Sequence, residues 1–353
     1  MTYLRNAWYA ALWSEMLGQG TVARRMLDEP ILFYRDSGGR AVALANRCPH
    51  RFAPLDRGII IGDEVQCGYH GLRFAPDGRC RYSPQTPEAP PAARIRSYPI
   101  AERDTILWIW MGHAEDADPG LIPAYPVLND DREHRTVRGY YRSAGHYQLV
   151  IDNLMDLTHP EFVHAGSLGS PDLNRACYEV ERAGPRSVRS NRWYTHGASP
   201  PAFERFFPTA GRQVEHWVDM LWTAPANLAL TVGITLSDTP RSEGRESLSL
   251  HLLSPETATH THYLFSSTRS HSLDSVEQDR RSLETIRHAF EMEDSPMLAA
   301  VQANMGTSDL WSLRPLILPG DAGAVRARRL LDKLIREEVA LDAGKIPVDQ
   351  GSI

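Results

Sequence analysis

Two short segments of the sequence each bring one cysteine and one histidine close together. The first is Cys48-Pro-His50, and the second, after sixteen intervening residues, is Cys67-Gly-Tyr-His70. Thiolate sulfur and imidazole nitrogen are both good metal ligands, and each segment is short enough to present its pair from one tight loop. The four side chains therefore make one complete set of potential metal ligands.

This ligand set suits two kinds of metal centre. A zinc ion accepts two cysteines and two histidines in a tetrahedron, whereas a Rieske 2Fe-2S cluster takes both cysteines on one iron and both histidines on the other. Zinc fingers usually pair cysteine with cysteine, but here each segment offers one residue of each type, which favours the Rieske cluster. Gly58, Gly68 and Gly71 would let backbone N–H groups approach the cluster sulfurs.

A second group of potential ligands lies within residues 152–164. Asp156 precedes His159 by three residues, so on a helix the two would share a face. His164 follows five residues later, a rotation of about 500° that leaves it roughly 140° from that face. Both histidines could bind one metal only if the helix were kinked, and Pro160 is the expected position of the kink. Two imidazoles and a carboxylate form the facial triad of non-haem Fe(II) oxygenases, which leaves open positions for dioxygen.

The third ligand of such a triad must come from another part of the chain. Asp294 is the best candidate and Glu293 the alternative, and both lie in a helical pattern from about Ser282 to Met305. Pro296 follows closely and predicts a distortion of that helix near the ligand. Two histidines alone could equally be a structural pair, and it is the first metal motif in the same chain that favours iron.

Together the two motifs make the sequence resemble the α subunits of Rieske non-haem iron oxygenases. The similarity covers most of the chain and is carried by the segments 5–9, 48–55, 68–72, 152–159 and 290–294. Within that family the sequence is most similar to vanillate O-demethylase oxygenase subunits and to toluenesulfonate methyl-monooxygenase.

The resemblance assigns roles to particular residues. It implies that the cluster is held by Cys48, His50, Cys67 and His70. It implies that the mononuclear iron is held by His159, His164 and Asp294. Asp156 would be a catalytic bridge that hydrogen-bonds a cluster histidine of a neighbouring subunit on one side and an iron histidine on the other, and Asn153 would support the iron site. Such a bridge requires a homotrimer or a multiple of it.

The resemblance also implies a reaction. An NAD(P)H-dependent, ferredoxin-type reductase would supply electrons, and O2 would be the cosubstrate of a monooxygenase that O-demethylates a methoxylated, vanillate-like aromatic acid and releases formaldehyde. Hydroxylation of an aryl methyl group, as on toluenesulfonate, and N-demethylation are the alternatives. A Rieske electron-transfer protein is the alternative from another class. For the substrate pocket, the resemblance points to Asn227 and His251 on strands that face the iron, and to Trp193 as a wall.

The elements that position these residues divide the chain into two parts. Residues 1–112 alternate short apolar runs with turn signals and predict an all-β Rieske 2Fe-2S domain. A linker follows at about 112–134, and residues 113–353 form the catalytic, mononuclear iron domain. That domain is expected to be α+β, of the helix-grip type, with antiparallel strands at 214–221, 228–236, 247–253 and 260–268 and a last helix near 325–339. Within the first part, Ala10 to Leu17 reads as helical.

Composition excludes several classes of protein. The 353 residues carry 38 Lys and Arg against 44 Asp and Glu, a net charge of −6, which argues against a nucleic-acid binder. The longest apolar runs are far shorter than the ~20 residues of a membrane helix, so no membrane partner is expected. The N-terminus lacks the apolar run of a signal peptide. We expect a cytoplasmic protein.

Overall fold

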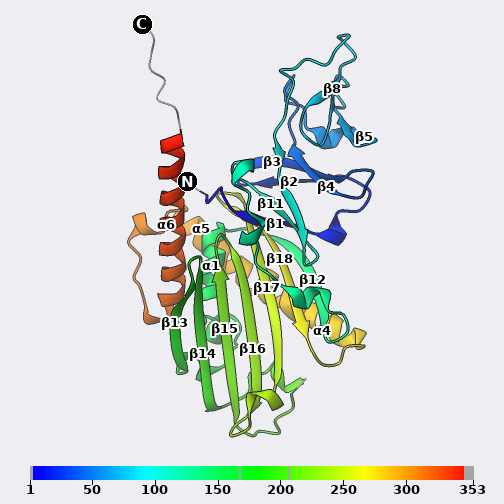
Figure 1. Ribbon diagram of the computed structural model, residues 1–353. Coiled ribbons are helices and arrows are strands. Elements are labelled where there is room, and N and C mark those ends of the chain that lie inside the picture. Colours follow the sequence, from blue (N-terminus) through cyan, green and yellow to red (C-terminus); the bar gives the residue numbers. More distant parts are fainter. Residues whose placement is uncertain (1–2, 167, 206, 346–353) are drawn as a thin grey trace.

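The computed structural model describes residues 3–166, 168–205 and 207–345. Up to Trp110 the chain forms small antiparallel sheets, which confirms the predicted all-β character of this part (Figure 1). One sheet contains β1 (Trp8–Trp13), β11 (Ile106–Trp110) and β10 (Ile100–Arg103). A second contains β2 (Val22–Met26), β3 (Glu29–Arg35), β4 (Ala41–Ala45) and β9 (Ser97–Tyr98). The third contains β5 (Ile59–Ile61), β6 (Glu64–Gln66), β7 (Arg73–Phe74) and β8 (Cys80–Tyr82).

The helix expected from Ala10 to Leu17 is wrong. Residues 8–13 form β1, all six of them buried, and only Ser14–Met16 makes a single 3-10 turn. Pairing with β11 and burial on both faces of the strand override the weak helical pattern, since a strand with two covered faces shows no alternation.

The larger part of the chain is built on one seven-stranded antiparallel sheet. Residues 112–134, where the linker is predicted, contain only 3-10 turns between β11 and β12. The strand order is β12-β18-β17-β16-β15-β14-β13. The bounds are β12 Arg135–Ser143, β13 Cys177–Gly184, β14 Ser187–Gly197, β15 Val214–Thr223, β16 Asn227–Leu236, β17 Arg245–Thr257 and β18 His260–Arg269. With its helices, this sheet confirms the predicted α+β class.

Helices supply the rest of this part and carry the predicted iron ligands. They are α1 (Tyr147–Met155), α2 (Pro160–Val163), α3 (Pro171–Asn174), α4 (Val276–Arg287), the π-helix η8 (His288–Asp294), α5 (Ser295–Met305) and α6 (Ala322–Lys345). The long α6 contains the predicted 325–339 helix and packs against α1 and β14. Among the described residues, no helix combines the length and hydropathy needed to cross a membrane.

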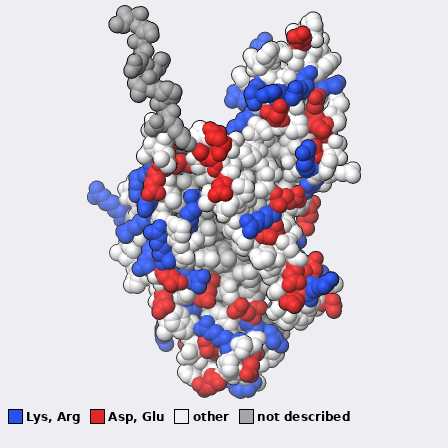
Figure 2. Space-filling view, in the orientation of Figure 1, with Lys and Arg blue, Asp and Glu red and all other residues white. Residues whose placement is uncertain are grey.

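The two parts share buried surface. Tryptophans of β1 and β11, among them Trp108 and Trp110, pack with Leu250 and Leu252 of β17 in one apolar cluster. These leucines occupy one face of the large sheet, so their odd-numbered neighbours on β17 must face the opposite side. On the face drawn in Figure 2, acidic and basic side chains are interspersed.

A buried histidine joins the two parts at a second point. His262 Nε2 donates to the backbone oxygen of Arg25 at 2.9 Å, so its Nδ1 is the acceptor for the Arg24 guanidinium at 3.0 Å and the Tyr140 hydroxyl at 2.9 Å. Burial, and then the charge of Arg24, lower the pKa of His262 to about 4. The hydrogen bond to the Arg25 backbone and the Glu256 carboxylate act in the opposite direction.

We therefore expect His262 to make stability depend on acid pH. Its contribution is complete above pH 6.5, and roughly 3 kcal/mol is lost as the pH falls from 6.5 through about 4, because the unfolded chain binds the proton first. His262→Gln removes the titration and keeps a polar side chain. The difference in unfolding free energy between wild type and variant, measured from pH 4 to 7, should narrow as the pH falls. Parallel curves would contradict this account.

Candidate active site

The four Cys and His side chains of the first motif separate by type. Cys48 and Cys67 are buried together in the core of the β5–β8 sheet, and burial raises the pKa of the Cys48 thiol. The rings of His50 and His70 meet edge to face, with centroids 4.4 Å apart, nearer the surface. Among the described residues, these four do not form a group close enough to share one metal ion, as tetrahedral zinc would require. Two thiols on one side and two imidazoles on the other fit a two-iron cluster.

Two glycines let the loops that carry these residues pack together. A Cβ on Gly58 would lie 1.9 Å from a backbone oxygen of the second loop, and one on Gly68 would lie 2.6 Å from a backbone oxygen of the first. Each cysteine also closes a tight turn, since the backbone N–H of Phe52 donates to Cys48 O at 2.9 Å and that of Gly71 to Cys67 O at 3.1 Å. Glycine is therefore required at these positions for the loops to pack closely. This reason adds to the predicted one, that glycine lets backbone N–H groups approach the cluster sulfurs.

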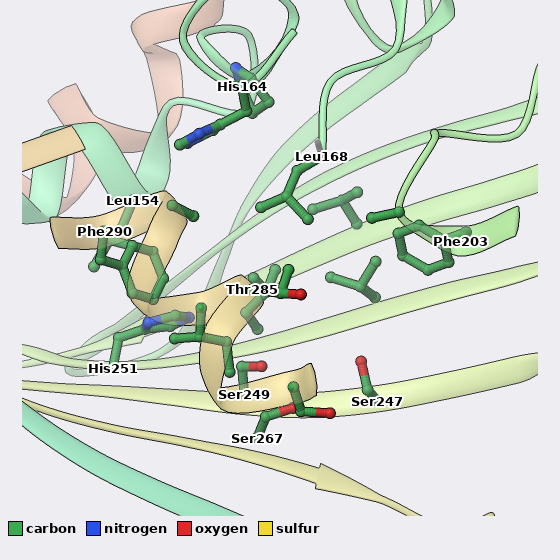
Figure 3. Close-up of a pocket in the computed structure, with 18 of the residues that line it drawn as sticks. Leu154, His164, Leu168, Phe203, Ser247, Ser249, His251, Ser267, Thr285 and Phe290 are labelled. Carbon is green, nitrogen blue, oxygen red and sulfur yellow. The ribbon is translucent and has the colours of Figure 1, made fainter. Parts of the chain in front are cut away.

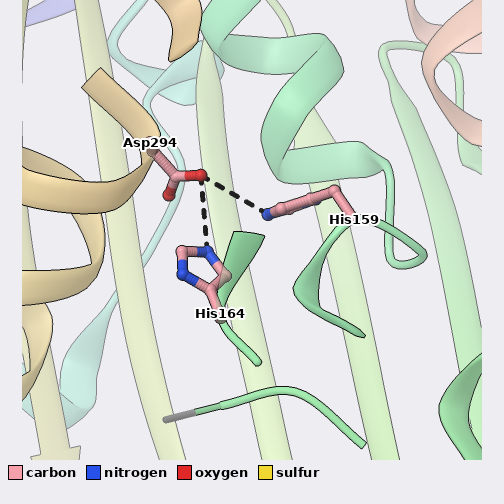
Figure 4. A group of neighbouring side chains, drawn as sticks. All are labelled: His159, His164 and Asp294. Carbon is pink, nitrogen blue, oxygen red and sulfur yellow. Dashed lines mark ion pairs between the residues drawn. The ribbon is translucent and has the colours of Figure 1, made fainter. Parts of the chain in front are cut away.

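The second motif forms one compact group. Asp294 Oδ1 lies 3.3 Å from His164 Nε2 and 3.6 Å from His159 Nε2 (Figure 4). Among the described residues, this trio is the group of His, Cys, Asp or Glu side chains that could hold a metal ion. Asp294 and His164 are each 2% exposed, and the second oxygen of Asp294 is buried without a hydrogen-bond partner in the described chain. An orphaned buried carboxylate oxygen is what a missing cation would satisfy.

Hydrogen bonds set both imidazoles for metal binding. His159 Nδ1 lies 2.6 Å from the backbone oxygen of Asp156, and His164 Nδ1 lies 2.7 Å from a carboxylate oxygen of Glu293. Because these oxygens accept, both Nδ1 atoms carry the proton, and both Nε2 lone pairs point toward Asp294. Glu293 thus orients His164, which decides the ambiguity between Glu293 and Asp294 in favour of Asp294 as the ligand.

Electrostatics also favour a cation here. Burial alone would lower the pKa of His164, but the carboxylates of Asp294 and Glu293 raise it above its usual value. Without a metal, a proton between these groups balances the acidic charge. A divalent metal supplies two positive charges and takes the position of that proton.

The backbone around the histidines differs from the predicted kinked helix. Helix α1 ends at Met155, and a separate helix α2 begins at Pro160, so the break precedes His159 instead of falling at the proline. The Asp156 carboxylate makes this break, because it accepts hydrogen bonds from the Thr158 backbone N–H at 2.8 Å and hydroxyl at 2.5 Å. Proline then occupies the first turn of α2, where its missing N–H costs nothing.

The predicted distortion near Asp294 is present as the π-helix η8, which lies between α4 and α5. Pro296 lacks the N–H that would continue regular α-helical bonding back into this segment, and π-turns frequently occur at functional sites. Asn153 donates to Asp294 Oδ1 at 3.0 Å, so it orients the ligand carboxylate as an iron-site support would.

Asp156 is placed only partly as predicted. Its bond to the iron histidine comes from the backbone oxygen, while its carboxylate lies 3.9 Å from His159 Nδ1, beyond hydrogen-bonding distance. The carboxylate is engaged by Thr158 and keeps partial exposure at the surface, so it is accessible to a second molecule.

A cavity of about 260 Å³ opens beside the trio (Figure 3). The sheet forms its floor, α4 and η8 form one side, and apolar side chains that the sequence did not reveal line the floor and the remaining wall. Among these are Leu154, Leu168, Phe203, Met220 and Leu230. Such lining suits an aromatic ring. Every second residue of β15 and β16 faces the cavity side of the sheet. Which residues these are depends on the register of the strands, and the sequence does not fix that register.

Of the three predicted pocket residues, the structure places only His251 in the cavity. His251 lies on the cavity face of β17, its ring edge to face with Phe290 at 5.3 Å between centroids. Asn227 pairs with Leu252, and Trp193 pairs with Trp217, residues of the opposite sheet face. Neither lines the cavity, because neighbouring residues on a strand point to opposite sides.

His251 has a ring nitrogen that no group in the described part of the chain engages. Its Nδ1 lies 2.6 Å from the Tyr263 hydroxyl, whose one hydrogen-bond partner within the described chain is His251. The hydroxyl therefore donates, and the imidazole proton stays on Nε2, which is buried without a partner in that part of the chain. Burial lowers the pKa of His251 to about 3, so at neutral pH the ring is an uncharged donor.

Comparison with known proteins agrees with this geometry. Residues 7–99 match the family described as Rieske [2Fe-2S] domain, and residues 143–337 match Vanillate O-demethylase oxygenase C-terminal domain. The chain is 36% identical to chloroacetanilide N-alkylformylase, oxygenase component, of Rhizorhabdus wittichii, covering 97% of this chain and 100% of the relative. It is 35% identical to dicamba O-demethylase, oxygenase component, of Stenotrophomonas maltophilia, covering 96% and 100%.

The solved structures lead to the same family. Dicamba monooxygenase bound to 3,6-dichlorosalicylic acid superposes with a TM-score of 0.91 at 33% identity, covering 96% of this chain and 100% of that one. The agreement extends over both metal-binding parts. The chain therefore belongs to the Rieske non-haem iron oxygenases as a demethylase-type oxidoreductase, with a Rieske [2Fe-2S] cluster and a mononuclear iron site at His159, His164 and Asp294.

Proposed function

We propose that this oxygenase component O-demethylates a methoxylated, vanillate-like aromatic acid. The reaction consumes the methyl aryl ether, O2, two electrons and two protons, and yields a phenol, formaldehyde and water. The observation that carries the proposal is the apolar cavity that joins His159, His164 and Asp294 to the free donor of His251. Relatives named for O-demethylation of dicamba and of vanillate support it.

The chain's own residues would bind the groups that the reaction needs. We assign the cluster to Cys48, His50, Cys67 and His70. When bound, the cluster delivers electrons one at a time and the iron activates dioxygen. The protein holds the ligands in place, excludes water from the cavity with its apolar walls, and orients the methoxyl group of the substrate toward the trio.

His251 would orient the acid group. A carboxylate accepts hydrogen bonds only, and the Nε2–H of His251 is a buried donor that lacks an acceptor. Arg245 and Arg281 line the outer end of the same cavity, where they favour entry of an anion.

Replacing His251 by leucine should weaken substrate binding more than it slows chemistry. The loss of one hydrogen bond to a charged group, about 1.5–3 kcal/mol, predicts a rise in KM of about tenfold to a hundredfold with a smaller change in kcat. His196→Leu, on an exposed position of β14, is the matched control. An unchanged KM in the His251 variant would show that this residue does not bind the substrate.

Electrons would come from an NAD(P)H-dependent, ferredoxin-type reductase. The names of the relatives, an oxygenase component and an iron-sulfur subunit of a monooxygenase system, support a separate electron donor.

The active unit would be a homotrimer or a multiple of it. In Figure 1 the β5–β8 sheet, which carries the cluster loops, lies at the end of the N-terminal part that is remote from α4. Phe52 and Tyr69 of these loops are largely exposed, and so are Phe162 and Leu316 on the catalytic part. If the cluster loops of one copy packed against the catalytic part of a second copy, both apolar surfaces would be buried. The cluster of the first copy would then lie near Asp156 of the second.

A panel of compounds tests the proposed reaction. Methoxybenzoates, toluates and aryl sulfonates are incubated with the holoenzyme and a surrogate reductase, while oxygen uptake and formaldehyde are followed. Formaldehyde equimolar with consumed methoxybenzoate is the expected result. Formation of benzylic alcohols from toluates or sulfonates would show that the enzyme is a methyl hydroxylase and not an O-demethylase. Formaldehyde from N-methyl compounds alone would indicate N-demethylation. An iron content of about two per chain, instead of about three, would mean that only the cluster is present. The protein would then be an electron-transfer protein.

A further inference from the structure

The register of the large sheet divides the cavity floor into two chemically different halves. On β15 and β16, Met220 pairs with Leu230 and Val218 with Val232, so this half is apolar. On β16 and β17, Leu230 pairs in turn with Ser249, and across to β18 Ser249 pairs with Ser267. One row farther out, Val232 pairs with Ser247. All of these side chains line the cavity.

Three hydroxyls thus lie side by side on the β17–β18 half, visible along the floor in Figure 3. In the described chain, Ser247, Ser249 and Ser267 make no side-chain hydrogen bond to another residue. The sheet does not need serine here for its own structure, because the positions in the same rows of β15 and β16 are filled by valine, leucine and methionine. Three hydroxyls on one half of the floor, opposite an apolar half, point to a polar part of the ligand on that side.

We infer that Ser249 and Ser267 form a hydrogen-bonding subsite for an oxygen substituent on one edge of the substrate ring. The inference rests on the proposed function and narrows its substrate to a benzoate that carries, besides the methoxyl group, a ring hydroxyl or a similar oxygen group. A hydroxyl both donates and accepts, as do the two facing serines, whereas a carboxylate only accepts and is matched by His251.

This arrangement discriminates against halogenated or alkylated rings. Such substituents cannot satisfy the two serine hydroxyls, which lose water when the cavity fills. The opposite half of the floor, with Met220 and Leu230, accepts the bare edge of the ring. The subsite therefore fixes which edge of the ring faces which strand, and with it the ring position that meets the trio.

Equilibrium binding to the holoenzyme without reductase tests the inference separately from turnover. The probes are 4-hydroxy-3-methoxybenzoate and 4-chloro-3-methoxybenzoate, measured by isothermal titration calorimetry with wild type, Ser249→Ala, Ser267→Ala and the double variant. Each lost bond should weaken binding of the hydroxylated probe about fivefold, and the pair about 25-fold, while the chlorinated probe binds unchanged or more tightly. Ser249→Thr, which keeps a hydroxyl, should retain the preference. Ser187→Ala on β14, whose hydroxyl pairs with Thr223 away from the cavity, is the matched control.

Each outcome has a separate meaning. Equal weakening of both probes would show that the serines bind the carboxylate or serve packing, and would overturn the inference, as would unchanged binding in the double variant. Preference for the hydroxylated probe without any formaldehyde in the turnover assay would refute the proposed function and leave the subsite standing. Thermal unfolding of each variant confirms that the fold is intact.

Discussion

Replacing Asp156 by alanine should leave both metal centres filled and reduce turnover by about a hundredfold or more, a large effect for a residue outside the ligand set. His159 is anchored through the backbone oxygen of residue 156, which the substitution keeps. The carboxylate, by contrast, is partly exposed and held by Thr158, and in the proposed homotrimer it would meet a cluster histidine of another subunit. Its loss should therefore interrupt electron delivery and spare iron binding.

The measurement is single-turnover oxidation of the pre-reduced cluster in the presence of substrate, together with iron content. Thr158→Val is the matched control, because it removes one hydrogen bond to the carboxylate and keeps the carboxylate itself. Wild-type rates of cluster oxidation in the alanine variant would refute the bridging role. Loss of iron would instead show that residue 156 supports the metal site directly.

Mixed oligomers distinguish transfer between subunits from transfer within one chain. A Cys48→Ala subunit lacks the cluster but keeps its iron site, and an Asp294→Ala subunit keeps the cluster but lacks the iron. Each should be inactive alone, and co-assembly should restore part of the activity if electrons cross a subunit boundary. Inactive hybrids of confirmed mixed composition would argue for transfer within one chain.

The metal ligands could be predicted from sequence because their chemistry depends on residue type and short spacing. Two Cys/His pairs on tight loops, and two histidines five residues apart, remain recognisable whatever the surrounding fold. The local backbone was less predictable. The break before His159 comes from the side chain of Asp156 bonding to Thr158, a competition between side chain and helix that a proline-based expectation overlooks.

The substrate cavity could not be predicted because it depends on strand register. Asn227 and His251 lie on neighbouring strands, yet only His251 faces the cavity, and a shift of either strand by one residue would reverse the face that its own residue occupies. The predicted strands do not include β13 and β14. In β13, Tyr178 and Val180 alternate with Glu179 and Glu181, but this run is only as long as the shortest strand signal.

Removing the ligand carboxylate and removing its neighbour should have sharply different results. Asp294→Ala deletes the buried oxygens between His159 and His164, so iron per chain should fall from about three to about two, and turnover should become undetectable while the Rieske spectrum persists. Glu293→Gln leaves that carboxylate in place and weakens the bond to His164 Nδ1, so iron should remain at saturating metal with about tenfold to a hundredfold lower affinity.

Iron analysis and the visible spectrum of both variants check this expectation, with Glu291→Gln, half-buried on the same π-helix and paired with Arg287, as a control that should behave as wild type. The reverse order, with iron lost on replacing Glu293 and kept on replacing Asp294, would exchange the two roles. Such a result would mean that bound metal rotates η8 by one residue relative to the present geometry. This is a physical alternative because both carboxylates already lie beside the His164 ring, Glu293 at 2.7 Å from Nδ1 and Asp294 at 3.3 Å from Nε2.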